Sequence, residues 1–98
     1  MARIPEPAEV VSAIRDGLTR LLPPDDLAQV DLPGLDESTP MLSLPVDSAV
    51  LMALMNDLED TFAVYIEEES AFSFESVGDV SDYIRERLAA KASRSDGP

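Results

Sequence analysis

Residues 44–62 of the chain read LPVDSAVLMALMNDLEDTF. Apolar side chains recur here at three- and four-residue spacing, at Leu51, Leu54, Met55, Leu58 and Phe62. This spacing places them on one face of a helix. Asp47 supplies an N-cap side chain immediately before Ser48, so we predict a helix that runs from Ser48 to about Thr61 or Phe62.

A second apolar stripe lies upstream, at Val10, Val11, Ile14, Leu18, Leu21 and Leu22. Prolines bound it on both sides, because Pro5 and Pro7 disfavour a helix before about Ala8 and Pro23-Pro24 ends one. The first helix is therefore predicted between these prolines.

Two more helices are predicted downstream. The run from Glu67 to Ala71 places acids at the N-terminus of a short helix, where the helix dipole favours them. Ser76-Val77-Gly78-Asp79 fits a capping box in its serine and its carboxylate. Apolar residues follow at helical spacing, at Val77, Val80, Ile84 and Leu88. The last helix should end near Ala90 to Lys91.

Residues 25–46 contain too many prolines for one helix, at Pro33, Pro40 and Pro45. Single apolar residues are scattered through this segment, at Leu27, Val30, Leu32, Leu35, Met41, Leu42 and Leu44. Loops of this length are uncommon in compact domains, so we predict an ordered loop held over the core by these residues. A short helical turn within residues 25–30 is compatible with this pattern.

The chain has 98 residues, of which 45% are apolar and only 5% aromatic. A chain this short forms one domain, and a core poor in aromatics consists mainly of aliphatic residues, which suits packed helices. We predict an all-α fold, a small four-helix bundle with three longer helices, one short helix and a long loop between the first and second. The helical domain should span residues 8–91, with flexible ends at residues 1–7 and 92–98.

The charge is strongly and unevenly negative, with 7 basic against 20 acidic residues and a net charge of −13. Between Leu21 and Ile84 there are fifteen acids and no Lys or Arg. This segment would repel nucleic acid and anionic lipid and attract proteins with basic patches. The alternative is that the charge merely keeps a small domain soluble.

The chain offers little for catalysis. It contains neither His nor Cys, so it cannot assemble a serine–histidine pair or a thiolate nucleophile. Carboxylates are abundant, but a small bundle offers little concave pocket in which to raise the pKa of one of them. We therefore expect a protein that is not an enzyme.

Metal binding and membrane insertion are also not expected. No acidic cluster has the spacing of a calcium loop with its central Gly. The N-terminus lacks the features of a signal peptide, and the longest apolar stretch, residues 49–55, is too short to cross a bilayer. We expect a cytoplasmic, soluble monomer.

Ser48 follows a proline-marked loop and opens an apolar-faced helix. A phosphate ester on its hydroxyl would lie beside free helix N–H groups and the positive end of the helix dipole, which favour an anion. Taken alone, Asp47 and Ser48 are better explained as ordinary cap residues, because caps of this kind are common.

The wider pattern separates these two interpretations. An Asp-Ser dipeptide opens the second long helix, residues 58–62 (LEDTF) close it, and residues 66–69 (IEEE) and 76–80 (SVGDV) lead into the last helix. In order and separation, these motifs resemble the acyl carrier protein family. The resemblance implies that a phosphopantetheinyl transferase attaches 4′-phosphopantetheine from coenzyme A at Ser48, beside the helix cap Asp47. The thiol that this chain lacks would then be on the attached arm.

Two positions depart from the family pattern. The family usually has Gly two residues before the Asp and Leu just after the Ser, where this chain has Pro45 and Ala49. We therefore expect a stiffer loop and a smaller apolar contact next to the arm.

The first turns of the predicted second helix are apolar, where fatty-acid carriers tend to show acids to their partners. Val50 and Met52 lie outside the inward stripe, so we expect at least one of them to be exposed and to contact partner enzymes. The acids assigned to partner binding lie further along, at Asp57, Glu59, Asp60 and Glu67.

This apolar edge favours a carrier in polyketide, nonribosomal-peptide or hybrid natural-product biosynthesis over one in housekeeping fatty-acid synthesis. The implied partners are the transferase, an acyl-loading ligase or acyltransferase, and a ketosynthase or other processing enzyme with a basic patch. One alternative is a dedicated aminoacyl carrier loaded by a separate ligase. The other is an acidic protein-interaction module that is never modified.

Overall fold

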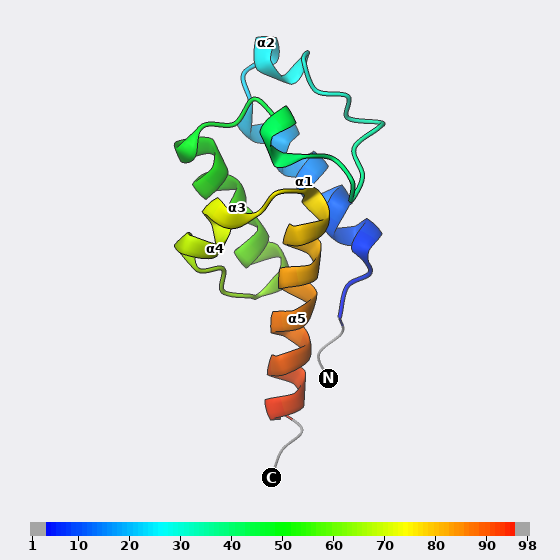
Figure 1. Cartoon of the computed structure of the whole chain (residues 1–98), viewed down its shortest axis with the longest axis vertical. Helices are drawn as coiled ribbons and strands as arrows, with labels where there is room; N and C mark the ends of the chain where they lie inside the picture. The colour runs from blue at the N-terminus through cyan, green and yellow to red at the C-terminus, as the bar shows by residue number, and fades with distance from the viewer. Residues whose placement is uncertain (1–3, 96–98) are drawn as a thin grey trace.

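The computed structural model describes residues 4–95, with side chains up to residue 92. The elements in chain order are α1 (Pro7–Leu21), α2 (Pro24–Leu27), the 3₁₀ helix η1 (Met41–Ser43), α3 (Ser48–Phe62), α4 (Glu68–Ser73) and α5 (Val77–Ser95) (Figure 1). Over the described residues the backbone forms no strand, only an isolated bridge between Pro40 and Ser76. The predicted all-α class is confirmed, and the long loop contains α2 and η1.

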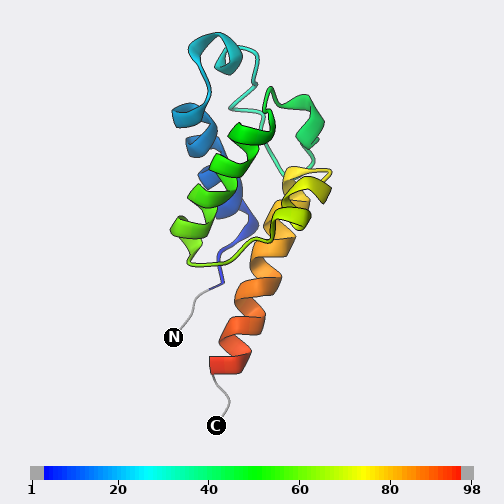
Figure 2. The same ribbon diagram turned by 90° about the vertical axis from the view of Figure 1, so that its left-hand side faces the viewer.

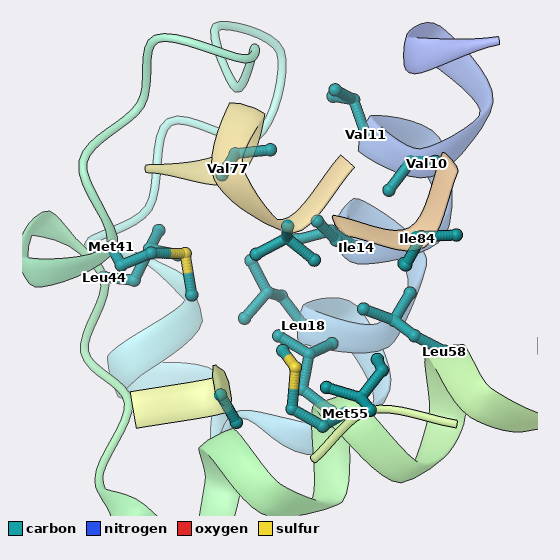
Figure 3. Packing of buried hydrophobic residues seen from close by; sticks show 14 of the residues in the cluster. Val10, Val11, Ile14, Leu18, Met41, Leu44, Met55, Leu58, Val77 and Ile84 are labelled. Atoms are coloured by element: carbon teal, nitrogen blue, oxygen red, sulfur yellow. The ribbon is translucent and has the colours of Figure 1, made fainter. Parts of the chain in front are cut away.

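The bundle is organised around α1, which packs against both α3 and α5, while the short α4 packs against α3 (Figures 1 and 2). The apolar side chains buried most completely come from α1, α3 and α5, namely Val10, Ile14, Leu18, Leu54, Met55, Leu58, Val77, Val80 and Ile84. Figure 3 shows several of them meeting in one cluster. Each large apolar side chain buried here contributes about 1.5–3 kcal/mol, so this cluster holds the helices together.

Both ends of α3 have a local cause. At its start, Asp47 Oδ1 accepts a hydrogen bond from the backbone N–H of Val50 at 2.8 Å, which confirms the predicted cap. At its end, Ala63 adopts a left-handed conformation (φ 53°, ψ 50°) that terminates the helix. The observed range, residues 48–62, agrees with the prediction.

The start of α5 has the predicted capping box. Ser76 Oγ accepts from the N–H of Asp79 at 3.2 Å, and Asp79 Oδ2 accepts from the N–H of Ser76 at 3.3 Å. Gly78 lies against the long loop, where its N–H donates to the carbonyl of Glu37 at 2.8 Å. A Cβ at Gly78 would lie 2.9 Å from that oxygen, so a glycine permits this close approach.

Arg15 of α1 holds the middle of the long loop in place. Its Nε donates to the carbonyl of Leu32 at 2.8 Å, and its Nη2 donates to the carbonyl of Leu35 at 3.1 Å. Leu35, Met41 and Leu44 are buried. The predicted ordered loop over the core is therefore confirmed.

The helix ends differ from the predictions at two places. The short helix α4 begins and ends later than predicted, at Glu68 and Ser73. The last helix α5 continues to Ser95, so the predicted end near Ala90 to Lys91 is wrong. The reason is local, because residues 92–95 contain no Gly or Pro to stop the helix, and its final turns project beyond the bundle (Figure 1).

The two chain ends are described in part. Residues 1–3 and 96–98 of the predicted flexible ends lie outside the described residues. Pro5 is buried, and its carbonyl accepts a hydrogen bond from Arg85 Nε at 3.0 Å. Among the described residues, no helix is long and apolar enough to span a membrane.

Candidate functional site

Ser48 is the first residue of α3, and its side chain is exposed. The first hydrogen bond of the helix runs from the N–H of Leu51 to the carbonyl of Asp47, at 2.8 Å. The N–H groups of Ser48 and Ala49 precede that bond, so helix geometry gives them no partner within α3. The hydroxyl therefore lies in solvent, beside free N–H donors at the positive end of a 15-residue helix.

Asp47, the residue before Ser48, places a negative charge at the same end of the helix. The carboxylate is exposed, and its Oδ1 is bonded to the N–H of Val50. No Lys or Arg occurs along the chain between Leu21 and Ile84, and the start of α3 supplies a positive potential for an anion at Ser48. A single phosphate diester fits this setting, because it needs an accessible oxygen and a few N–H donors.

A pocket of about 280 Å³ opens beside Ser48, which is one of its lining residues. The pocket lies among the η1 segment, the first turns of α3, and α4. Its apolar walls include Leu44, Val46, Leu51, Ala71 and Phe74. An exposed hydroxyl therefore lies at the edge of an apolar pocket.

Two large apolar side chains at this pocket are exposed to solvent. Leu42 of η1 is 99% exposed and Phe72 of α4 is 52% exposed, and both line the pocket with Ser48. The expectation that Leu42 helps to hold the loop over the core is wrong. In a 3₁₀ helix residues three apart share a face, so η1 turns Met41 and Leu44 inward and directs Leu42 outward.

The expectation that Val50 or Met52 is exposed is wrong. Both are partly buried and pack against the margin of the core. The reason is that α3 packs against both α1 and α4, and the two side chains lie against the core that these helices form. Leu51, predicted to face fully inward, is also only partly buried.

Two of the acids predicted to bind partner enzymes form interactions with residues of the chain itself. Asp57 Oδ2 forms an ion pair with Arg20 Nη2 of α1 at 2.6 Å, and this hydrogen bond raises the pKa of Arg20. Glu59 Oε2 accepts from the N–H of Ile66 at 2.8 Å, in a partly buried position that ties down the segment after α3. These two acids therefore connect α3 to its neighbours.

The other two predicted acids, Asp60 and Glu67, are exposed. Glu67 is the N-cap residue of α4, and its backbone N–H donates to the hydroxyl of Tyr83 at 3.3 Å. Neither lines the pocket beside Ser48. The structure brings Asp47 together with Ser48, but it leaves Asp57, Glu59 and Asp60 at the other end of α3 and Glu67 at the start of α4.

The sequence did not predict that Leu42 and Phe72 are both exposed at the pocket beside Ser48. One sequence signal exists for Leu42. Met41 and Leu44 are apolar and three residues apart, so in a short 3₁₀ turn they share the inward face and leave Leu42 outside it. Phe72 gives no such signal, because its nearness to Ser48 depends on how α4 packs on α3.

Comparison with known proteins agrees with this geometry. Residues 25–84, 60 of the 98 residues, match the family described as "PP-binding: Phosphopantetheine attachment site". A 45-residue stretch is 42% identical to an acyl carrier protein of Exiguobacterium sibiricum; it covers 46% of this chain and 57% of that protein, so the match spans little more than half of the relative. The chain therefore belongs to the acyl carrier protein family, whose prosthetic group is a covalently attached 4′-phosphopantetheine.

Proposed function

We propose that this chain carries acyl groups on a 4′-phosphopantetheine arm attached at Ser48. The observation that carries the proposal is the position of Ser48, exposed at the open start of α3 and inside the matched family region. The arm supplies a terminal thiol that can hold an acyl group as a thioester, and the chain itself has no cysteine.

Attachment requires little from the chain beyond an accessible hydroxyl. Ser48 Oγ would attack the phosphorus that bears the pantetheine of coenzyme A, and the bond from that phosphorus to the bridging oxygen would break, so that adenosine 3′,5′-bisphosphate leaves with that oxygen. The hydroxyl proton would pass to a base of the transferase, because the chain contains no histidine and the nearest carboxylate, Asp47, caps the helix. The N–H groups at the start of α3 would stabilise the resulting phosphodiester.

The proposed role is that of a non-catalytic carrier. Its partners would be a phosphopantetheinyl transferase, an acyl-loading ligase or acyltransferase, and a ketosynthase or other processing enzyme. The charge of the chain favours partners with a basic surface, because the stretch between Leu21 and Ile84 contains fifteen acids and no Lys or Arg. A monomeric state and a cytoplasmic location remain parts of this proposal.

The biosynthetic setting is proposed from the departures from the family pattern at Pro45 and Ala49. They favour a carrier in polyketide, nonribosomal-peptide or hybrid natural-product biosynthesis. A dedicated aminoacyl carrier, loaded by a separate ligase, is the second candidate. Intact-protein mass spectrometry of the chain isolated from its native cell distinguishes the two, because it weighs the arm and cargo together.

The attachment site is tested by incubating the chain with coenzyme A and a broad-specificity phosphopantetheinyl transferase. We expect a mass increase of one phosphopantetheine, and complete loss of labelling in Ser48→Ala. Ser43→Ala is the matched control, because Ser43 is an exposed serine in η1 whose hydroxyl donates to the carbonyl of Pro40 at 2.7 Å. It should label like the parent.

Three outcomes would contradict the proposal. Labelling of Ser48→Ala at the parental rate would place the arm elsewhere. An unlabelled parent that binds a basic protein in low salt would indicate an acidic interaction module. Turnover by the purified, unmodified chain would indicate an enzyme.

A further inference from the structure

We propose that the second half of α5 is a docking surface for an acidic segment of another protein. The surface consists of Arg87 and Lys91, and we call this pair the basic stripe. The inference goes beyond the proposed function and does not depend on it, because the stripe lies away from Ser48.

The charge of the chain changes sign in the second half of α5. Residues 85–94 contain four of the seven bases of the chain and a single acid, whereas fifteen acids and no base lie between Leu21 and Ile84. Arg87 and Lys91 are four residues apart, so they share one face of the helix, and both side chains are exposed. The last turns of this helix project beyond the bundle (Figures 1 and 2). A chain with a net charge of −13 therefore carries a local positive surface.

Neither residue of the basic stripe has a carboxylate partner within the described part of the chain, where the ion pair that forms joins Arg20 to Asp57. Lys91 Nζ donates to a backbone carbonyl, that of Ala63, at 3.2 Å. An ammonium group has three N–H donors, so two of them remain for a partner. The charge of the stripe is therefore available to another molecule.

Arg87 is held in a position that suits a carboxylate. Its guanidinium carbon lies 5.5 Å from the centre of the Tyr83 ring, in a cation–π contact. Tyr83 is itself fixed, because its ring makes an edge contact with Phe74 at 5.4 Å and its hydroxyl accepts from the N–H of Glu67 at 3.3 Å. The ring contacts the face of the guanidinium and leaves its N–H edge, which matches the two oxygens of a carboxylate. A side chain placed in advance loses less entropy on binding.

The basic stripe and Ser48 lie near opposite ends of α3. Lys91 contacts Ala63, the C-cap of α3, whereas Ser48 is the first residue of that 15-residue helix. About 22 Å of helix separate the two ends. Neither residue of the stripe lines the pocket beside Ser48. An acidic partner can therefore hold α5 while a basic enzyme acts on Ser48.

An acidic protein segment fits this surface better than other anionic partners do. Nucleic acid and anionic membranes are extended polyanions, so the many acids elsewhere on the chain would repel them. A second copy of the chain would bring another net charge of −13 against the first. A short segment with a few carboxylates needs only to reach two cations that lie one helical turn apart.

The test titrates the isotopically labelled chain with a short peptide of alternating Glu and Gly in dilute buffer, and follows the backbone amide signals by NMR. A peptide of alternating Gln and Gly is the uncharged control. The variants are Arg87→Gln, Lys91→Gln and the two combined. Arg20→Gln is the matched control, because it removes the same charge from a base that is paired with Asp57. Thermal melting establishes that each variant is folded.

We expect the acidic peptide to move the signals of the last turns of α5 and to leave those at the start of α3 unchanged. The combined variant should bind about tenfold more weakly, because charge-assisted hydrogen bonds are lost, and concentrated salt should weaken binding by the parent. Arg20→Gln should bind like the parent. Arg87→Lys should retain only part of the affinity, since lysine lacks the planar fork of arginine.

A folded parent whose signals do not move, or a combined variant that binds as tightly as the parent, would overturn the inference. Tighter, stripe-dependent binding of polyphosphate or of phosphatidylglycerol vesicles would show that the partner is not a protein segment. A parent that is dimeric by analytical ultracentrifugation, with a monomeric combined variant, would assign the stripe to a second copy and also contradict the inference. Failure of Ser48 to accept phosphopantetheine would defeat the proposed function alone.

Discussion

The two ends of α3 differ in how their polar side chains are used. At the N-terminal end, Ser48 is exposed and the N–H groups of Ser48 and Ala49 precede the first helical hydrogen bond. At the C-terminal end, Asp57 forms an ion pair with Arg20, and Glu59 accepts a hydrogen bond from the N–H of Ile66. At the first end the serine is exposed, whereas at the second end two acids form interactions within the chain.

This contrast shows why acidic residues are poor guides to a binding surface when read from the sequence alone. A partner-facing acid and a structural acid have the same formal charge. From the sequence, Glu59 was predicted to bind partner enzymes. In the structure its Oε2 accepts a hydrogen bond at 2.8 Å from the backbone N–H of Ile66, seven residues away. Three changes test the contrast, two in α3 and one at Arg20 of α1, and we order them from the largest expected effect to the smallest.

The largest effect is expected at the C-terminal end, from Glu59→Ala. The change removes a charged acceptor, so the partly buried N–H of Ile66 loses its hydrogen bond. We expect the free energy of unfolding to fall by about 1.5–3 kcal/mol. Urea denaturation followed by circular dichroism measures it. Glu59→Gln keeps an oxygen acceptor and should lose less.

Phosphopantetheine labelling of the folded Glu59→Ala chain should match that of the parent, because Glu59 is not at the Ser48 pocket. A large increase in KM without loss of stability would instead show that Glu59 contacts partners, as the sequence had suggested.

A smaller effect is expected at the N-terminal end, from Asp47→Ala. Loss of the N-cap bond to Val50 should lower the free energy of unfolding by about 1 kcal/mol. Labelling should also slow, because the first turn of α3 that presents Ser48 would fray. The same urea titration and a labelling time course provide both values.

Asp47→Asn is the matched control, because asparagine caps helices as well as aspartate does and removes only the charge. It should keep most of the stability. If Asp47→Ala labels at the parental rate, the order of the first turn has no role in presenting Ser48.

The smallest effect is expected from Arg20→Gln, which breaks the exposed ion pair with Asp57. Such pairs contribute little and are screened by salt. We expect a slightly lower melting temperature than that of the parent in dilute buffer, and no difference in concentrated salt. A difference that persists in concentrated salt would show that Arg20 acts through packing of its side chain and not through its charge.

Much of the fold is predictable from the sequence because its signals are local. The α3 stripe at Leu54, Met55 and Leu58 and the capping box at Ser76 and Asp79 each depend on residues within about one turn. The end of α5 was misplaced because no residue between Lys91 and Ser95 stops a helix. Stop signals are weak when a sequence offers neither Gly nor Pro.

The surroundings of Ser48 were predictable only in part. The Asp47 cap and the position of Ser48 at a helix start follow from adjacent residues. The partial burial of Val50 and Met52 does not, because it depends on contacts of α3 with both α1 and α4. A helical stripe tells which face points inward but not how much of the remaining surface the neighbouring helices cover.

The sequence by itself determined the helices, the cap at Asp47, the excess of acid and the absence of a thiol, because these depend on composition or on neighbours along the chain. Only the tertiary structure decided that Leu42 and Phe72 border the pocket of Ser48, and that Asp57 and Glu59 are engaged within the bundle. The physical reason is distance along the chain: segments far apart in sequence meet only when the core packs.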